Sequence, residues 1–307
     1  MTRRDWILLL ILAAIWGASY LFIEIGIRDL SAPMVVVVRV AFGAIVLLPL
    51  AAARGALAGI SRHWRPLVVV AGIQVAGPFI LITEGQGEIT SSLAGILVAS
   101  SPIFTALLAT FFDPEERSVG LRLVGVLVGV VGVGVLLGVD LGGSRAELLG
   151  GLAVVVASLG YAIGGFVVKR RLGAVAPIAV AASVLAISTL MVAPFALGSL
   201  PDQAPGIGPV AAVVGLGVVG TGVAFAIFYG LLARVGPARS FIVTYLAPAF
   251  AVVYGALLLE EAISVATLAG LGLILAGSFL AAEGRFPWQR RAIPPGPEPA
   301  GPIRTAA

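Results

Sequence analysis

Cysteine and asparagine are absent from the 307-residue chain, and histidine occurs once, at His63. The lack of cysteine excludes disulfides and thiolate metal sites, and the lack of asparagine excludes N-linked glycosylation. With one histidine as well, we expect neither a metal nor a cofactor. Charged residues make up only 11% of the chain, against about 25% in an average soluble domain. There is therefore too little polar material to cover a water-facing globule of this size.

The chain consists instead of uncharged apolar runs, each about as long as a bilayer is thick. A helix of about 20 apolar residues crosses a hydrocarbon core of about 30 Å. The runs are continuous, whereas β-barrel strands would alternate in polarity, and the first run is too long for a signal peptide. The ten predicted spans are 6–26, 33–53, 66–85, 90–112, 119–138, 148–168, 175–198, 208–232, 238–259 and 263–282. The sequence thus predicts an all-α polytopic membrane protein.

The basic residues gather in alternate gaps between these spans. One side of the membrane receives Arg3, Arg4, Arg54, Arg62, Arg65, Arg117, Arg122, Lys169, Arg170, Arg171, Arg234, Arg239, Arg285, Arg290, Arg291 and Arg304. The opposite side receives only Arg28 and Arg145. The positive-inside rule then places both termini in the cytoplasm of a multi-pass protein of the bacterial inner membrane. Membrane topology explains the basic residues, so we expect no nucleic-acid partner.

The two halves of the chain match each other at a shift of about 145 residues. The matching pairs are Pro33 with Pro177, Pro102 with Pro248, Glu116 with Glu261, and Gly125 with Gly270. Five spans per half place the second copy upside down, which is the architecture of many secondary transporters. We expect a first repeat at 1–143, a second at 144–284, and a disordered, proline-rich cytoplasmic tail at 285–307.

This arrangement resembles the EamA family of the drug/metabolite transporter superfamily. The resemblance rests on Trp16-Gly17, Pro33, Arg39, Ser101-Pro102, Glu116, Gly125, Pro248, Glu260-Glu261, Gly270 and Gly277. It covers residues 6 to about 282, although Gly160-Tyr161 in the second half replaces the tryptophan of the first. It implies ten helices in two inverted repeats that carry small metabolites across the lipid bilayer by alternating access.

Three charged residues fall inside the predicted spans: Glu24, Arg39 and Glu84. A charge at the bilayer centre costs about 2.5–3.5 kcal/mol on insertion scales, so each is a functional candidate. All three lie in the outer half of the membrane. We hypothesise that Arg39 faces a central cavity and pairs with Glu24 or Glu84, as an outer gate or an anion-binding point, and that the acids exchange protons. Alternatively, the acids sit in headgroup water and Arg39 snorkels outward.

Polar and amphipathic side chains inside the spans are candidates for the substrate site. Together with Arg39 they are Trp16, Tyr20, Gln74, Ser101, Tyr161, Tyr229 and Tyr245. Aromatic rings with one polar tip suit amphipathic metabolites. The alternatives are serine hydroxyls bonded to a carbonyl one turn back, and tyrosines placed at the lipid interface.

Proline and glycine positions suggest how the helices bend and pack. Pro102 and Pro248 are predicted to lie inside spans, where a proline kinks the helix and serves either as a gating hinge or as a static bend. Gly125, Gly129, Gly134 and Gly138 would let a neighbouring backbone approach closely. We favour packing within the chain over a homodimer face for this stripe.

The function predicted from these features is secondary active transport of small organic metabolites, with export of amino acids or related compounds favoured. The alternatives are an uncoupled or channel-like facilitator, an uptake carrier and an intramembrane enzyme. The chain has no phosphate-binding Walker loop and no Ser-His-Asp or HExxH set, so neither ATP-driven transport nor an enzyme is favoured.

Overall fold

The computed structural model describes residues 1–112, 120–140 and 144–284, and every regular element in these ranges is helical. In the first half the elements are α1 (Arg3–Gly26), α2 (Ala32–Ala53), η1 (Ile60–His63), α3 (Trp64–Val70), η2 (Ala71–Ala76), α4 (Gly77–Gln86), α5 (Ser91–Val98), α6 (Ser101–Phe112), α7 (Leu121–Val135) and η4 (Leu136–Asp140). In the second half they are α8 (Arg145–Val167), η5 (Val168–Leu172), α9 (Pro177–Leu197), α10 (Ile207–Gly215), η6 (Leu216–Val223), α11 (Ala224–Val235), α12 (Pro237–Ser240), α13 (Val243–Leu258) and α14 (Val265–Glu283).

The helices are long and apolar enough to span a membrane. Nine such segments occur in the described residues, and the shorter apolar helix α13 stands at the place of the ninth predicted span. The outer surface exposes large apolar side chains, including Leu190 at 75% and Ile207 at 88%. A surface of this kind suits lipid and not water. The prediction of an all-α polytopic membrane protein is confirmed.

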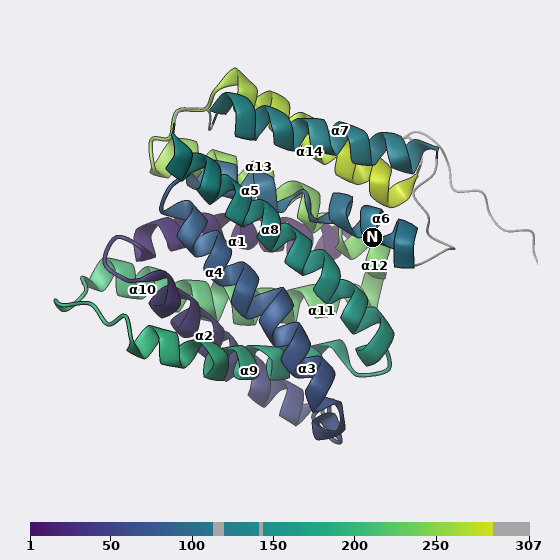
Figure 1. Cartoon of the computed structure of the whole chain (residues 1–307). Helices are drawn as coiled ribbons and strands as arrows, with labels where there is room; N and C mark the ends of the chain where they lie inside the picture. The colour runs from purple at the N-terminus through teal and green to yellow at the C-terminus, as the bar shows by residue number, and fades with distance from the viewer. Residues whose placement is uncertain (113–119, 141–143, 285–307) are drawn as a thin grey trace, which may run out of the picture.

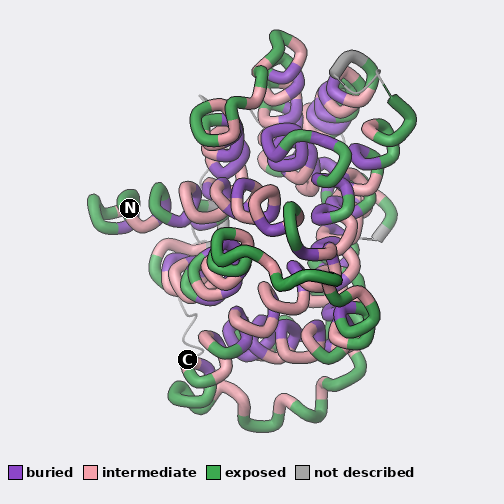
Figure 2. Tube along the Cα trace, turned by 90° about the vertical axis from the view of Figure 1, so that its left-hand side faces the viewer, coloured by how far each residue is buried: buried purple, intermediate pink, exposed green. Residues whose placement is uncertain are grey.

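Helices from the two halves pack in matching pairs. α7 lies against α14, α2 against α9, and α5 against α13 (Figure 1). α1 packs against the eighth and ninth spans through α10, α11 and α13, and α8 packs against the equivalent third and fourth spans through α4, α5 and α6. This exchange of partners follows from two inverted five-helix repeats. Viewed nearly along the helices, the exposed stretches gather in the connecting segments and on the rim (Figure 2).

Two of the long helices contain a wider π-helical stretch in the middle. η2 interrupts the third span and η6 interrupts the eighth, and the two begin 145 residues apart at Ala71 and Leu216. π-Helical turns inside α-helices often mark functional positions, because they displace side chains from the regular helical spacing. The irregularity therefore recurs at the equivalent place in both repeats.

The fourth predicted span differs from its expected form. It is broken at residues 99–100 into α5 and α6, so Pro102 is the second residue of a new helix. Pro102 does lie inside the fourth span, Ser91–Phe111, as predicted, and the predicted kink takes the form of a break, because the proline ring would clash with the carbonyl of Val98. The Ser101 hydroxyl donates at 2.7 Å to the Val98 carbonyl, which the proline leaves without its usual backbone partner. The Ser100 hydroxyl donates at 2.6 Å to the Leu97 carbonyl, which also accepts from the Ser100 backbone N–H.

The ninth predicted span is also divided, into α12 and α13, with residues 241–242 between them. Pro248, in contrast to Pro102, does lie inside its helix, α13, and is buried. The two prolines that match in sequence thus occupy different places relative to the breaks. Whether either acts as a hinge stays a prediction.

Glu116 and the tail at 285–307 lie outside the described residues.

The contact between α7 and α14 depends on glycine. A Cβ atom on Gly277 would lie 2.4 Å from the backbone nitrogen of Gly129, and one on Gly125 would lie 2.3 Å from the nitrogen of Ala281. The predicted packing role of Gly125 and Gly129 is therefore confirmed. For Gly134 and Gly138 it is wrong, since their Cβ positions face open space and Gly132 approaches α14 instead. Successive residues of a helix are about 100° apart around its axis, so Gly134, five residues after Gly129, no longer faces α14.

We predict that Gly277→Val destabilises the protein by about 3 kcal/mol, because both neighbours of the new side chain are backbone atoms that cannot move aside. Thermal unfolding of the detergent-solubilised protein measures the effect. Gly272→Val is the matched control on the same helix, since nothing lies within 4 Å of its Cβ position. Equal melting temperatures for the two variants would contradict the packing account.

Candidate functional site

Arg39 is held in the middle of the bundle by groups from both repeats. Its Nε donates a hydrogen bond to the Thr221 hydroxyl at 3.2 Å, and its guanidinium carbon lies 3.8 Å from the centroid of the Phe79 ring. The Thr221 hydroxyl in turn donates to the Leu216 carbonyl, five residues back within the π-helical stretch η6. The guanidinium thus has a cation–π contact on its face and one hydrogen bond at its base.

The outer end of the same guanidinium makes no hydrogen bond or ion pair to the part of the chain that the structure describes. The two Nη atoms appear in no hydrogen bond, and neither is among the buried polar atoms that lack a partner. They are therefore reachable by solvent or a ligand. Two parallel N–H groups of a guanidinium match the two oxygens of a carboxylate.

Two of the predicted tyrosines lie beside Arg39. The phenols of Tyr20 on α1 and Tyr161 on α8 interact electrostatically with the guanidinium. Tyr161 packs against both of the larger clusters of buried apolar side chains, so this position lies where the two clusters meet. Tyr20, Arg39, Phe79, Tyr161 and Thr221 are called the Arg39 cluster below.

The expected ion pair of Arg39 with Glu24 or Glu84 does not occur, which corrects that prediction. The described residues of the bundle place neither carboxylate within 4 Å of the guanidinium. The reason is depth: Glu24 lies two residues from the end of α1, or about 3 Å. Arg39 lies seven residues past the start of α2, or about 10 Å into the bundle.

Trp16 and Tyr229 belong to a separate aromatic group between α1 and α11. Trp16 lies 5.4 Å from Phe228 and 6.0 Å from Phe225, whose ring stacks on Tyr229 at 5.9 Å. These two predicted binding residues therefore share the same ring partners, Phe225 and Phe228. The group lies nearer than Tyr20 to the end of the bundle where α1 begins.

The remaining candidates are dispersed. The stem of Gln74 packs closely against Gly164 of α8, and Tyr245 lies 6.2 Å from Phe279. The Ser101 hydroxyl bonds to the carbonyl of Val98. Their roles in binding stay predictions, and Ser101 has the structural partner that the alternative interpretation expects.

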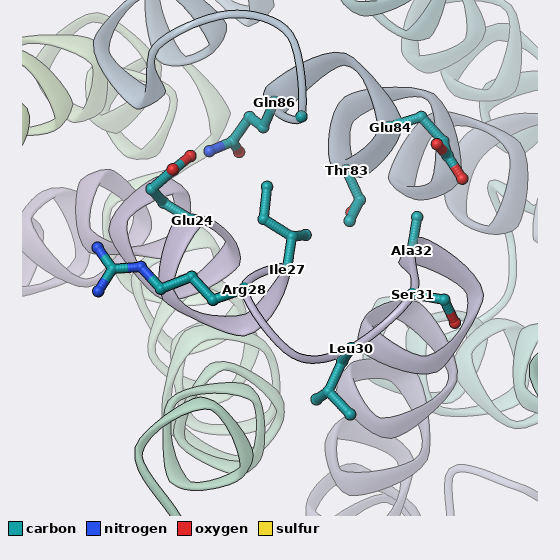
Figure 3. Close-up of a pocket in the computed structure, with 10 residues that line it drawn as sticks. Glu24, Ile27, Arg28, Leu30, Ser31, Ala32, Thr83, Glu84 and Gln86 are labelled. Carbon is teal, nitrogen blue, oxygen red and sulfur yellow. The ribbon is translucent and has the colours of Figure 1, made fainter. Parts of the chain in front are cut away.

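A polar pocket of about 440 Å³ opens at the other end, where α1 ends and α2 begins (Figure 3). Glu24 and Arg28 line it from α1 and the following turn, and Thr83, Glu84 and Gln86 line it from α4. Glu24 is half-buried, whereas Glu84 and Arg28 are exposed. The predicted gating or coupling acids thus share one pocket, although they do not share it with Arg39. We call it the distal pocket.

Polar contacts join the two repeats at both ends of the bundle. At the end where α1 begins, Asp5 pairs with Arg234 of α11 at 2.5 Å. At the distal end, the Glu261 carboxylate accepts hydrogen bonds from the backbone N–H groups of Ser91 and Ser92, at 2.8 and 3.1 Å, and from the Ser92 hydroxyl. A second-repeat acid thus caps a first-repeat helix, α5.

Comparison with known proteins agrees with this architecture. The family model described as the EamA-like transporter family matches twice, at residues 4–138 and 148–282. The chain belongs to the EamA-like transporter family. The fold agrees with that of a solved crystal structure at a TM-score of 0.66 and 20% identity, covering 92% of this chain and 98% of that one.

Two relatives from Escherichia coli illustrate the family. An uncharacterized inner membrane transporter is 28% identical over 89% of this chain and 88% of its own length. A protein named as a probable amino-acid metabolite efflux pump is 25% identical over 91% of this chain and 95% of its own. The chain is therefore similar, over nearly its full length, to membrane transporters.

Four contributors to these sites were missed from the sequence. Phe79 and Thr221 contact Arg39, Gln86 lines the distal pocket, and Glu261 caps α5. Phe79 has no polar signal, and Thr221 lies in a glycine-rich stretch that reads as ordinary packing. The π-helical turn that brings Thr221 to Arg39 has no signature in the sequence.

We predict that Glu261→Ala destabilises the protein by about 1–2 kcal/mol, because it removes the cap of α5 and leaves two backbone N–H groups unpaired. Thermal unfolding in detergent measures the change. Glu260→Asn is the control: it removes the neighbouring charge, while asparagine tolerates the positive φ of 57° found there. The cap would be unimportant if both variants unfold at the wild-type temperature.

Proposed function

We propose that the protein is a secondary active transporter that exports small carboxylate-bearing metabolites, amino acids or related compounds, by alternating access. The observation on which this rests is the Arg39 guanidinium. It is fixed by Thr221 and Phe79, yet both of its Nη atoms are left for a ligand. An unpaired charge inside an apolar bundle is unfavourable, so its retention favours a role in binding an anionic group.

The surroundings of Arg39 support an amphipathic substrate. Phe79, Tyr20 and Tyr161 offer ring surfaces for an apolar side chain, while the phenols and the guanidinium offer hydrogen bonds. The relative named as a probable amino-acid metabolite efflux pump agrees with this chemistry.

The contacts at the two ends support alternating access. The two halves of the chain, which we divide into repeats at 1–143 and 144–284, meet at one end through Asp5 and Arg234. At the other end they meet through Glu261 and α5, through Ser31 and Ser199, and through Asp29 and Gly206. Separating the contacts at one end while those at the other end hold would open the Arg39 cluster to one side at a time. The charge distribution favours a cytoplasmic location for both termini in the inner membrane, with the distal pocket on the outer side. Proton coupling through Glu24 or Glu84 stays a prediction.

We predict that Arg39→Ala lowers uptake of the substrate into proteoliposomes by at least about tenfold, because a charge-assisted contact is lost. Arg39→Lys should retain part of the activity, since it keeps the charge and loses the planar pair of donors. Arg54→Ala is the control, an exposed arginine just past the end of the same helix. Unchanged transport by a folded Arg39→Ala protein would remove Arg39 from the mechanism.

We also predict the direction of transport. Cells that overexpress the protein should tolerate higher concentrations of toxic amino-acid analogues than cells that overexpress Arg39→Ala, because export lowers the internal concentration. Growth inhibition across a panel of analogues measures this. Greater sensitivity would identify an uptake carrier instead.

A further inference from the structure

The distal pocket contains three buried oxygen atoms that have no hydrogen-bond partner. They are Oε2 of Glu24, Oγ1 of Thr83 and Oε1 of Gln86. Thr83 is 1% exposed and Gln86 is 3% exposed. An unpaired polar atom removed from water normally costs free energy, so three around one pocket indicate a missing ligand.

The orientation of these groups is determined by their neighbours. The Gln86 Nε2 donates to the Tyr20 backbone carbonyl at 3.0 Å, and a carbonyl can only accept, so the amide oxygen is the atom left unpaired. Thr83 lies in α4 without bonding to a carbonyl of its own helix, unlike Thr105 and Thr189. Thr83, Gln86 and Glu24 all line the pocket, where the side chains of Gln86 and Glu24 point toward one another and that of Thr83 lies apart from them (Figure 3).

The charges around the pocket favour a cation. Glu24 and Glu84 are acidic, and Arg28 is the one basic group that lines the pocket. Glu24 is repelled by Glu261 and attracted by Arg28, so the acids outnumber the base around it. Across the described residues, Glu24 has no ion pair within 4 Å, and Arg28 is exposed. The Glu24 carboxylate is therefore not neutralised by a salt bridge to the protein.

We infer that the distal pocket binds a primary ammonium group, as an exit station for the amino end of the substrate. A primary ammonium has three N–H donors, which equal the three unpaired oxygens in number. Tyr20, whose carbonyl holds Gln86, also belongs to the Arg39 cluster, and Glu24 lies one helical turn, about 6 Å, farther out. The carboxylate would leave Arg39 as the ammonium engages Glu24. This inference rests on the proposed function only in assigning the ammonium to the substrate.

Calorimetric titration of the full chain in detergent with ethylammonium chloride tests the site. Tetramethylammonium chloride and sodium chloride, at equal ionic strength, are the probes without N–H donors. We expect Glu24→Gln to weaken ethylammonium binding about tenfold, and Thr83→Val about fivefold. Glu88→Gln, at an exposed acid of the following turn that does not line the pocket, should change it less than about twofold.

Some outcomes would overturn the inference without any variant. The inference is wrong if the wild-type protein does not bind ethylammonium. It is also wrong if the protein binds tetramethylammonium or sodium with the same affinity as ethylammonium. Unaltered binding by folded Glu24→Gln would also overturn it. A second assay identifies the source of the ammonium: ethylammonium should inhibit amino-acid flux in proteoliposomes, and binding without inhibition would contradict a substrate exit station.

The same titrations separate this inference from the proposed function. Arg39→Ala should lose binding of acetate and keep binding of ethylammonium. If the wild-type protein binds ethylammonium but no carboxylate, the proposed function fails and the ammonium site stands. If it binds carboxylates but not ethylammonium, the reverse holds.

Discussion

A guanidinium inside an apolar helix bundle is the constraint around which this structure is arranged. Moving a charge from water into the membrane is unfavourable, and the bundle offsets only part of that for Arg39. Thr221 from the second repeat accepts one hydrogen bond, and Phe79 from the first offers its ring face. Because these partners come from both repeats, the position of the charge depends on how the repeats meet.

The interface between the two repeats contains both closely packed contacts and contacts that can separate. Along α7 and α14 the backbones touch through glycines, which leaves no room for sliding. At the two ends, by contrast, the repeats are joined by polar contacts. Asp5 pairs with Arg234 at one end, and Glu261 with the start of α5, Ser31 with Ser199 and Asp29 with Gly206 form the contacts at the other. Polar contacts that water can replace are suited to opening and closing, while a packed glycine seam is suited to staying closed.

The sequence predicted the large features because they depend on composition. Span length, the matching of the halves and the family resemblance are all properties of apolar runs and of a few prolines and glycines. A kink at Pro102 was predicted, but its size was not, because the local clash with Val98 competes with the tendency of an apolar run to continue as one helix. The Ser101 hydroxyl favours the break by bonding to the freed carbonyl of Val98.

The site was predicted less completely than the fold. Three predicted site residues from different spans, Arg39, Tyr20 and Tyr161, lie together in the structure. Two others, Trp16 and Tyr229, belong to a separate aromatic group. Depth along a helix can be counted from sequence, and it already separates Arg39 from Glu24. The direction in which a side chain points after a π-helical turn cannot be obtained by counting residues. For this reason the contact of Thr221 with Arg39 was not predicted.

Thiol labelling tests the central claim most directly, since the wild-type chain has no cysteine to mask the signal. The claim is that the Arg39 cluster is a water-accessible anion site between the repeats. Tyr161→Cys should react with membrane-impermeant thiosulfonates, faster with an anionic reagent than with a cationic one, and Arg39→Ala should abolish that charge preference. Val253→Cys, on an exposed apolar surface, should stay unreactive. If Tyr161→Cys is as unreactive as Val253→Cys, or reacts without regard to reagent charge, the account is wrong.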